Sequence, residues 1–506
     1  MKELKQIRSK ISKIKNKSNN NDFDRGNDLA SEIYDEYQKY LFTNNLVDFD
    51  DLLLLTIELF KRFPEIKKIY NNKFQYVLVD EFQDTNNVQY ELVSLILGDN
   101  KNIFIVGDED QSIYAFRGAN IKNISKFKED YPDYHIVLLE ENYRSTNNIL
   151  KAANQIIEHN NNRIEKKLFS SKGDGEAIIK YKGATERDEV EYISKQILKL
   201  TRKGFKYSDF AVLYRMNNLS RMFEDNFISK HIPYGIVGNT SFYKRREIKD
   251  FISYLRMILS SSDFFSFERA ISNPKRGIGK KTLLKIKDYM YLYDLDIFEA
   301  IDKSREFLGK SASDKLIVFK ESIEDYRHKF EVLALNDFVD YILSDSGYLK
   351  ALKKDEKFDD RYSNLLEFKS ILHENQSIYT ESSKQDMLLY LLEDISLKSD
   401  ENNEDLDNRV TLMTVHSAKG LEFRVVFVIG LENGIFPMIR ANEADQLEEE
   451  RRLMYVAVTR AKELLFLTNA NVRNLYGESK HTVESLFVKE IDEDLLSIEG
   501  YDSYTR

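Results

Sequence analysis

The chain has 506 residues, a formal net charge of −10 and no cysteine, which excludes disulfides and thiolate metal sites and suits a reducing compartment. The negative charge excludes nucleic-acid binding through overall basicity, although a local groove can still be basic. Since no apolar run is long enough to span a bilayer, we expect a cytoplasmic protein without a membrane partner.

The first 160 residues combine helical patterns with short apolar runs that read as strands. Apolar residues at helical spacing alternate along the chain with runs of Val, Ile and Leu, which favour strands. The expected elements are helices at 29–41, 52–60, 88–97 and 120–127, and strands at 77–79, 103–106 and 135–139. This order of strands and helices predicts an α/β unit with a parallel sheet.

A second α/β unit begins near residue 177 and is interrupted by a long helical stretch. The expected elements are strands at 177–181, 210–214, 234–237, 410–414, 425–429 and 464–468, and helices at 186–200 and 220–230. From 246 to about 392 the pattern is mostly helical, with few strand signals. The second unit is therefore expected to be split by a helical insertion.

Polar side chains follow two strands of the first unit, at the point where each strand ends. Asp80 and Glu81 come directly after the strand at 77–79, and Gln111 comes soon after the next strand. Ligands of open α/β sheets bind at the carboxyl ends of the strands. There Asp80 can hold Mg²⁺ through its water shell, and Glu81 can orient or deprotonate an attacking water. The pattern indicates nucleotide hydrolysis, although an isolated Asp-Glu pair at a strand end is more often a pair of solvated surface acids.

Longer stretches around these residues resemble the superfamily-one DNA helicases of the UvrD, PcrA and Rep group. DEFQDTN and GDEDQSIYAFRGA resemble motifs II and III, LEENYRST motif IV, TVHSAKGLEF motif V and YVAVTRA motif VI. The resemblance implies an α/β fold of the P-loop NTPase class, with two RecA-like parallel-sheet domains around a nucleotide cleft. It also implies ATP and Mg²⁺ as cofactors and 3′-to-5′ movement along single-stranded DNA, up to junctions with duplex, in DNA repair or replication.

The resemblance assigns roles to individual residues. Catalytic roles fall to Glu81, Gln111, Arg144 and Arg460, the last as a finger that reaches across the cleft to the γ-phosphate. Contacts with the nucleotide fall to Asp80, which also holds the metal, and to Tyr143, Gly420 and Glu422. Contacts with single-stranded DNA fall to Tyr114, Phe116, Arg117, Thr414 and His416. The family usually has Trp where Phe116 stands, so we expect weaker stacking on DNA here.

The phosphate-binding loop that such a nucleotide site requires, G-x-x-x-x-G-K-[ST], has no match in the sequence. The stretches around Lys280 and Lys310 come nearest, but Pro274 and Ser304 stand where the first glycine belongs. Three explanations are open: an N-terminally truncated helicase, a separate polypeptide that carries the loop, or a degenerate protein. We expect the first, with the chain inactive by itself. The alternative is a non-hydrolysing DNA- or partner-binding protein on the same scaffold.

These expectations define five parts of the chain. Residues 1–60 would be a remnant of a helical insertion of the first domain, and 61–160 the C-terminal part of the first RecA-like domain. The second RecA-like domain would comprise 161–250 and 399–506, separated by a helical insertion domain at 251–398.

Overall fold

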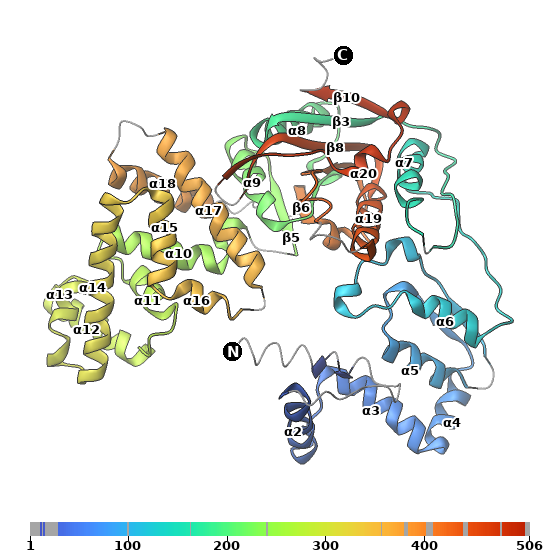
Figure 1. Cartoon of the computed structure of the whole chain (residues 1–506), viewed down its shortest axis with the longest axis horizontal. Helices are drawn as coiled ribbons and strands as arrows, with labels where there is room; N and C mark the ends of the chain where they lie inside the picture. The colour runs from blue at the N-terminus through green and yellow to red at the C-terminus, as the bar shows by residue number, and fades with distance from the viewer. Residues whose placement is uncertain are drawn as a thin grey trace.

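The computed structural model contains a small parallel sheet, a large mainly parallel sheet and a separate helical body (Figure 1). It describes residues 11–12, 14–15, 29–98, 101–161, 163–238, 241–355, 357–378, 383–400, 408–438, 444–475 and 478–500.

The small sheet belongs to the first α/β unit and has two named strands. β1 (Val77–Val79) pairs in parallel with β2 (Ile103–Ile105), and α5 (Asn87–Leu97) connects them. Asn86 caps α5 by accepting a hydrogen bond from the backbone N–H of Gln89 at 2.8 Å. The strand-helix-strand order predicted for this stretch is confirmed.

Within the described residues, the two faces of the small sheet differ in how far they are covered. Val79, Ile103 and Ile105 pack against a buried cluster of three rings, Phe82 and Tyr90 with Phe127 of α6 (Lys122–Asp130). On the opposite face Leu78 and Phe104 remain 73% and 63% exposed, because successive side chains of a strand point to opposite sides.

The strand predicted at 135–139 is wrong. These residues form no regular element, and the side chains of Val137 and Leu139 are 71% and 75% exposed. An apolar run becomes a strand only where a neighbouring strand satisfies its backbone N–H and C=O groups. Among the described residues, the small sheet does not extend to this run.

The helices α2 (Leu29–Thr43), α3 (Phe49–Arg62) and α4 (Pro64–Lys73) lead up to the small sheet. Asp48 and Asp51 form a capping box at the start of α3. Both carboxylates also bind the Lys15 ammonium, at 2.7 and 2.6 Å, and this cation is fully buried. The acidic start of α3 therefore caps the helix and also holds a segment from earlier in the chain.

The large sheet runs in the order β10-β3-β8-β7-β4-β6-β5, and β9 pairs with β8 in antiparallel fashion. The strands are β3 (Ile178–Thr185), β4 (Phe210–Tyr214), β5 (Tyr234–Val237), β6 (Val410–Thr414), β7 (Phe423–Val428), β8 (Ala461–Leu475), β9 (Glu478–His481) and β10 (Leu496–Gly500). The other pairings along this order are parallel, as predicted for the second α/β unit.

Helices cover both faces of the large sheet, and β4 shows how. Phe210, Val212 and Tyr214 pack with α8 (Glu186–Thr201) and α9 (Ser220–Ser229). The alternate residues Ala211 and Leu213 face a second cluster, built with α7 (Asn147–Ile157), α19 (Ala444–Val458) and α20 (Leu486–Lys489). A strand buried on both faces reads as a continuous apolar run, which explains why FAVLY was recognised without alternation.

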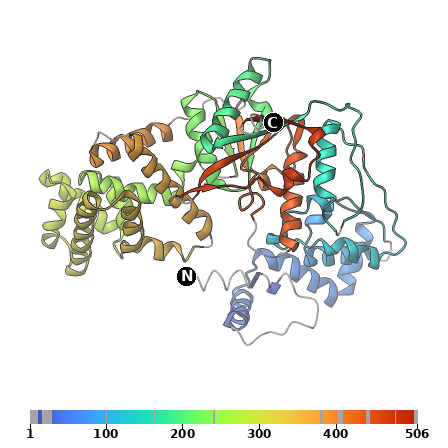
Figure 2. The same ribbon diagram turned by 45° about the horizontal axis from the view of Figure 1, so that its top comes forward.

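The helical body is inserted between β5 and β6, as predicted, and lies to one side of the large sheet (Figure 2). Its helices are α10 (Arg246–Leu259), α11 (Phe264–Ser272), α12 (Lys280–Tyr293), α13 (Ile297–Asp302), α14 (Lys310–Val332), α15 (Leu335–Asp345), α16 (Tyr348–Leu352), α17 (Phe358–Ile378) and α18 (Lys384–Asp400). It has a core of its own, in which Phe251, Phe267, Phe319 and Phe368 are buried. No helix in the described ranges combines the length and apolar character needed to cross a membrane.

Candidate active site

The ends of β1 and β2 carry the carboxylates that the sequence predicted. Asp80 and Glu81 follow β1 and are exposed, and Glu81 adopts a left-handed backbone conformation with φ of 50°. Such a conformation is costly for a residue other than glycine and is concentrated at functional sites. It turns the chain sharply at the strand end, into the short helix η1 (Phe82–Asp84).

Buried Gln83 connects the two strand ends. Its amide group donates to the Glu81 carboxylate at 2.6 Å, and its carbonyl oxygen accepts from the backbone N–H of Asp108 at 2.9 Å. A Cβ on Gly107 would lie 2.8 Å from that carbonyl oxygen, so a larger residue at 107 would displace the Gln83 side chain from this hydrogen bond. No role was predicted for Gln83, although its place two residues after Glu81, within DEFQDTN, was a signal.

Gln111 meets Arg460 between the two sheets. Gln111 ends the short helix η3 (Glu109–Gln111), and its side-chain oxygen accepts from Arg460 Nη2 at 3.2 Å. The Arg460 side chain also donates to the carbonyls of Val456 and Leu421, at 3.0 and 3.2 Å. Burial, followed by the positive charge of Arg144, lowers the pKa of Arg460 to about 10. Two residues from distant motifs are thereby brought into contact.

Lys419 is a further cation at this junction, and no role was predicted for it. It lies between β6 and β7, and its ammonium contacts Asp84 at 2.5 Å and Glu81 at 3.3 Å. It also donates to the Gln111 carbonyl at 3.0 Å and lies over the Tyr114 ring. Burial raises the pKa of Asp84, and the bond from Lys419 opposes this rise. The signal in the sequence was the position of Lys419 within TVHSAKGLEF.

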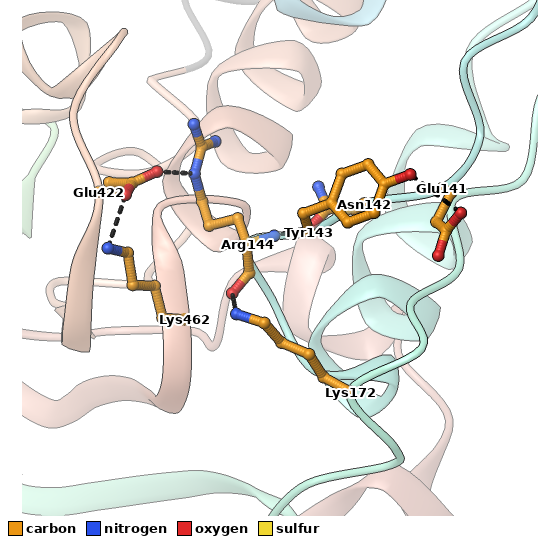
Figure 3. Close-up of a pocket in the computed structure, with 7 residues that line it drawn as sticks. All are labelled: Glu141, Asn142, Tyr143, Arg144, Lys172, Glu422 and Lys462. Carbon is orange, nitrogen blue, oxygen red and sulfur yellow. Dashed lines mark hydrogen bonds and ion pairs between the residues drawn. The ribbon is translucent and has the colours of Figure 1, made fainter.

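A cavity of about 480 Å³ lies around Arg144 and Glu422 (Figure 3). Its lining residues are Glu141, Asn142, Tyr143, Arg144, Lys172, Glu422 and Lys462. It brings together three residues that the sequence assigned to the nucleotide, Tyr143, Arg144 and Glu422. Arg144 also donates to the Thr459 carbonyl at 3.4 Å, next to Arg460.

Glu422 is the carboxylate that pairs with two of the cations in this cavity. Its carboxylate accepts from Arg144 Nε at 2.7 Å and pairs with Lys462 at 2.6 Å. The bonds from Lys462 and Arg144 lower the pKa of Glu422 to about 2. Tyr143 is 74% exposed and donates to Glu141 at 3.1 Å, so its ring is open to a planar ligand. Lys462 and Lys172 were not predicted as site residues.

The arrangement of the acidic residues suits one Mg²⁺ that is bound mainly through water and phosphate, without a full set of protein ligands. Among the described residues, no three acidic or histidine side chains converge on one point. Mg²⁺ commonly binds through one or two carboxylates, with water and phosphate completing the octahedron. Exposed Asp80 offers one carboxylate at the strand end, which fits this mode.

A group of aromatic rings spans both halves of the site. The Tyr114 and Phe116 rings lie 6.1 Å apart, and the Phe116 and His416 rings meet edge to face at 5.6 Å. Phe116 is 64% exposed and belongs to η4 (Ala115–Arg117), and His416 belongs to η9 (Val415–Ala418). The predicted DNA contacts Tyr114, Phe116 and His416 are thus brought together from two distant motifs.

The structure says less about three other predicted contacts, those of Thr414, Gly420 and Arg117. Thr414 is the N-cap of η9 and accepts from the backbone N–H of Ser417 at 3.3 Å, so its hydroxyl already has a local partner. Gly420 has φ of 82°, and a Cβ there would meet open space. The backbone conformation therefore explains why residue 420 is a glycine. Its predicted contact with the nucleotide stays a prediction. The side chain of Arg117 lies outside the part of the chain that the structure describes.

Glu109 is a buried acid within this site. Its carboxylate accepts from the backbone N–H of Ile164. Burial raises the pKa of Glu109 from 4.5 to about 7; the charge of Asp110 adds to the rise, and Lys166 opposes it. The folded chain keeps this proton to a higher pH than the unfolded chain. The resulting contribution to stability is complete below pH 4.5 and is lost as the pH rises through 7.

Glu109→Gln is expected to weaken this pH dependence, because the amide keeps the acceptor oxygen but carries no charge. Relative to the parent, the variant should gain roughly 1–3 kcal/mol between about pH 5 and about pH 8. Thermal unfolding followed at both pH values measures this gain. The exposed neighbour Glu165, changed to Gln, is the control and should give parallel curves. Parallel curves for Glu109→Gln as well would contradict a buried, protonated Glu109.

Two helicase family models match the chain. The UvrD/REP helicase N-terminal domain matches residues 1–132, and the UvrD-like helicase C-terminal domain matches residues 137–472, which is more than half of the chain. The first match begins at residue 1 and gives no support to the expectation that the N-terminal portion of the family is absent.

Curated relatives give the same family. The ATP-dependent DNA helicase PcrA of Staphylococcus epidermidis is 46% identical over 486 residues, which cover 94% of this chain and 65% of the relative. PcrA of Staphylococcus aureus is 43% identical over 477 residues, which cover 92% of this chain and 65% of the relative. The chain thus spans 65% of the length of these relatives. By sequence and by the family models that it matches, the chain belongs to the UvrD-like helicase family.

Proposed function

We propose that this chain takes part in ATP-driven movement along single-stranded DNA in the 3′-to-5′ direction, with junctions between single-stranded and duplex DNA as its substrate. The observation that carries the proposal is the contact between Gln111 and Arg460 at 3.2 Å, beside the cavity that holds Arg144 and Glu422. A nucleotide held here would be touched from both α/β units. The PcrA relatives are named as ATP-dependent DNA helicases, which supports the same conclusion.

In this proposal each site residue has one task. Glu81 takes a proton from the attacking water, and Gln111 orients that water or the γ-phosphate. Arg144 and Arg460 stabilise the charge of the transferred phosphoryl group. Both can reach that group only when the two units are close together. Mg²⁺, when bound at Asp80, supplies neutralising charge.

Both arginines already have partners without a nucleotide. Arg144 is paired with Glu422, and Arg460 contacts Gln111. We infer that a nucleotide exchanges with these partners: its phosphates take the guanidinium groups, and the released Glu422 is free to accept hydrogen bonds from the ribose. Tyr143 would stack on the base. Nucleotide binding would thereby rearrange contacts that join the two units.

The phosphate-binding loop is the part of this proposal that the sequence does not supply. Without its lysine and hydroxyl, the β- and γ-phosphates lack their main cradle. We therefore propose that the chain by itself hydrolyses ATP slowly or not at all, and that a polypeptide with the loop restores turnover.

The test is ATP hydrolysis by the 506-residue chain, with and without oligothymidine and with and without an added polypeptide that carries the loop. Turnover that appears only when both are added supports the proposal. DNA-stimulated turnover of the chain alone would show that other residues hold the phosphates. Oligothymidine binding without turnover under any condition would favour a second candidate function.

This second candidate is a non-hydrolysing DNA-binding protein on the same scaffold. The aromatic group of Tyr114, Phe116 and His416 favours it, because these rings do not depend on a phosphate-binding loop. Under this candidate Glu81→Gln leaves every measurable property of the chain unchanged.

Phe116→Ala is expected to weaken binding of single-stranded DNA by about 1–3 kcal/mol, the usual contribution of one base stacked on an aromatic side chain. Phe116→Trp should strengthen binding, because indole offers a larger stacking face. Fluorescence anisotropy of labelled oligothymidine at fixed salt measures both. Phe42 of α2, which is 86% exposed, provides the control variant Phe42→Ala. If the parent and Phe116→Ala bound oligothymidine with equal affinity, the predicted contact between Phe116 and DNA would be wrong.

A further inference from the structure

Three consecutive carboxylates, Asp108 to Asp110, hold the segment that leads from α7 to β3. Arg163 donates to Asp110 through two nitrogens, Nε at 3.1 Å and Nη2 at 2.8 Å. The Lys166 ammonium pairs with Asp108 at 2.5 Å and with Asp110 at 3.0 Å. Between them, the backbone N–H of Ile164 donates to Glu109. Residues 163–166, called the clasp below, therefore contact all three acids.

The clasp is largely withdrawn from solvent. The side chains of Asp110, Arg163 and Lys166 are 1%, 9% and 13% exposed. Ions in such places are costly unless their geometry is good and their hydrogen bonds are satisfied. The two-pronged bond between Arg163 and Asp110 meets this condition, because the guanidinium fork matches a carboxylate. A pair of this kind fixes position more than a surface ion pair does.

The clasp continues into the candidate catalytic residues. Asp108 uses its other oxygen to accept from the Gln111 side-chain amide at 2.7 Å. The carbonyl oxygen of the same amide accepts from Arg460. An unbroken series of hydrogen bonds thus leads from Lys166 through Asp108 and Gln111 to Arg460. It fixes which way the Gln111 amide faces, since one end meets a carboxylate and the other a guanidinium.

The segment just before the clasp is bound to the second unit. Asn160 donates to the Glu448 carbonyl of α19 at 3.1 Å and accepts from Arg451 of the same helix at 2.7 Å. One short stretch of chain is therefore attached to α19 at Asn160 and to the end of β2 at Arg163 and Lys166. A shift of α19 cannot leave η3 undisturbed.

We propose that Arg163 and Lys166 are positioning residues that hold η3 so that Gln111 meets Arg460, and that they transmit movement of α19 to Gln111. Neither residue lines the cavity with Arg144 and Glu422, and neither belongs to the motifs that suggested the site. The proposal rests on the proposed function for its kinetic consequence. Its physical part, the clasp on η3, holds without any turnover.

The first test needs no activity. In Arg163→Met and Lys166→Met, amide hydrogen exchange of residues 108–112 should accelerate, while exchange in β4 and in the helical body stays as in the parent. Lys167→Met is the matched control, because Lys167 is 84% exposed and its removal changes the charge equally. Lys166→Arg should restore protection, since it keeps the charge at the two carboxylates. Unchanged exchange at 108–112, or acceleration throughout the chain, would overturn the proposal.

The second test uses whichever preparation hydrolyses ATP with DNA present. Arg163→Met and Lys166→Met should lower kcat by about 100-fold, the effect of misplacing a catalytic group by an ångström, with KM for ATP unchanged. A raised KM with unchanged kcat would overturn the positioning role. If no preparation hydrolyses ATP, the proposed function fails, and hydrogen exchange alone decides whether the clasp holds η3.

Discussion

Glu81→Gln is expected to abolish DNA-stimulated ATP hydrolysis, lowering kcat by about 10²–10⁴-fold, the usual contribution of a general base. The amide has nearly the shape of the carboxylate and can still accept from Gln83, which holds Glu81 at 2.6 Å. It cannot take a proton from water. The substitution therefore removes proton abstraction and leaves the local fold in place. KM for ATP should stay close to that of the parent.

Glu129→Gln is the control for this measurement, since Glu129 is an exposed acid on α6, away from the strand ends. Both variants are compared with the parent in single-turnover hydrolysis, in the preparation that gives turnover. If Glu81→Gln keeps most of the parent's kcat, another group takes the proton, and the role proposed for Glu81 is wrong. Unchanged DNA binding by the variant would show that the loss is chemical.

Arg460→Lys is expected to have an even larger effect, about 10³–10⁵-fold on kcat, as for the loss of an arginine finger. Lysine keeps the charge but loses the planar fork. That fork lets Arg460 reach Gln111, Leu421 and Val456 at the same time, at 3.0 to 3.2 Å. A single ammonium cannot donate to all three of these oxygens in the same directions.

Because Arg460 is 2% exposed, loss of activity has to be separated from loss of stability. Unfolding of the variant is therefore measured beside its turnover. Arg452→Lys, on α19 just before Arg460, provides a control in a cation that pairs with Glu448 at 3.2 Å. Full turnover by folded Arg460→Lys would show that Arg460 is a structural residue of the α19–β8 corner.

Strands of the large sheet were the easiest elements to predict from the sequence. The bounds of β4, β5 and β6 match the prediction. For β4 the reason is clear, because all five of its residues are buried and form a continuous apolar run between Asp209 and Arg215. β8 is much longer than the predicted 464–468, because it continues past the apolar run to pair with β3 and β9. The run at 135–139 has the same composition as a strand but no partner, and composition does not reveal partners.

The candidate site was predictable where chemistry lies at a strand end or within a long motif. Asp80, Glu81 and Gln111 followed from strand ends, and Arg144, Glu422 and Arg460 followed from the family resemblance. Lys419 and Arg163 did not, because their partners lie far away in the sequence and are set by docking of the two units. Contacts of this kind have no local spacing, so a single sequence does not reveal the partners, even where a motif such as TVHSAKGLEF draws attention to Lys419.

The exposed face of the small sheet affects how the chain behaves in water. Leu78 and Phe104 present apolar side chains that stay in contact with solvent, and Val137 and Leu139, which form no strand, are exposed as well. Contact of these side chains with water is unfavourable, and folding of the described part of the chain does not remove this cost. Within that part, the sheet has two strands, so its outer edges also offer a template for strand addition. The small sheet is therefore where we expect concentrated solutions of the chain to begin to associate.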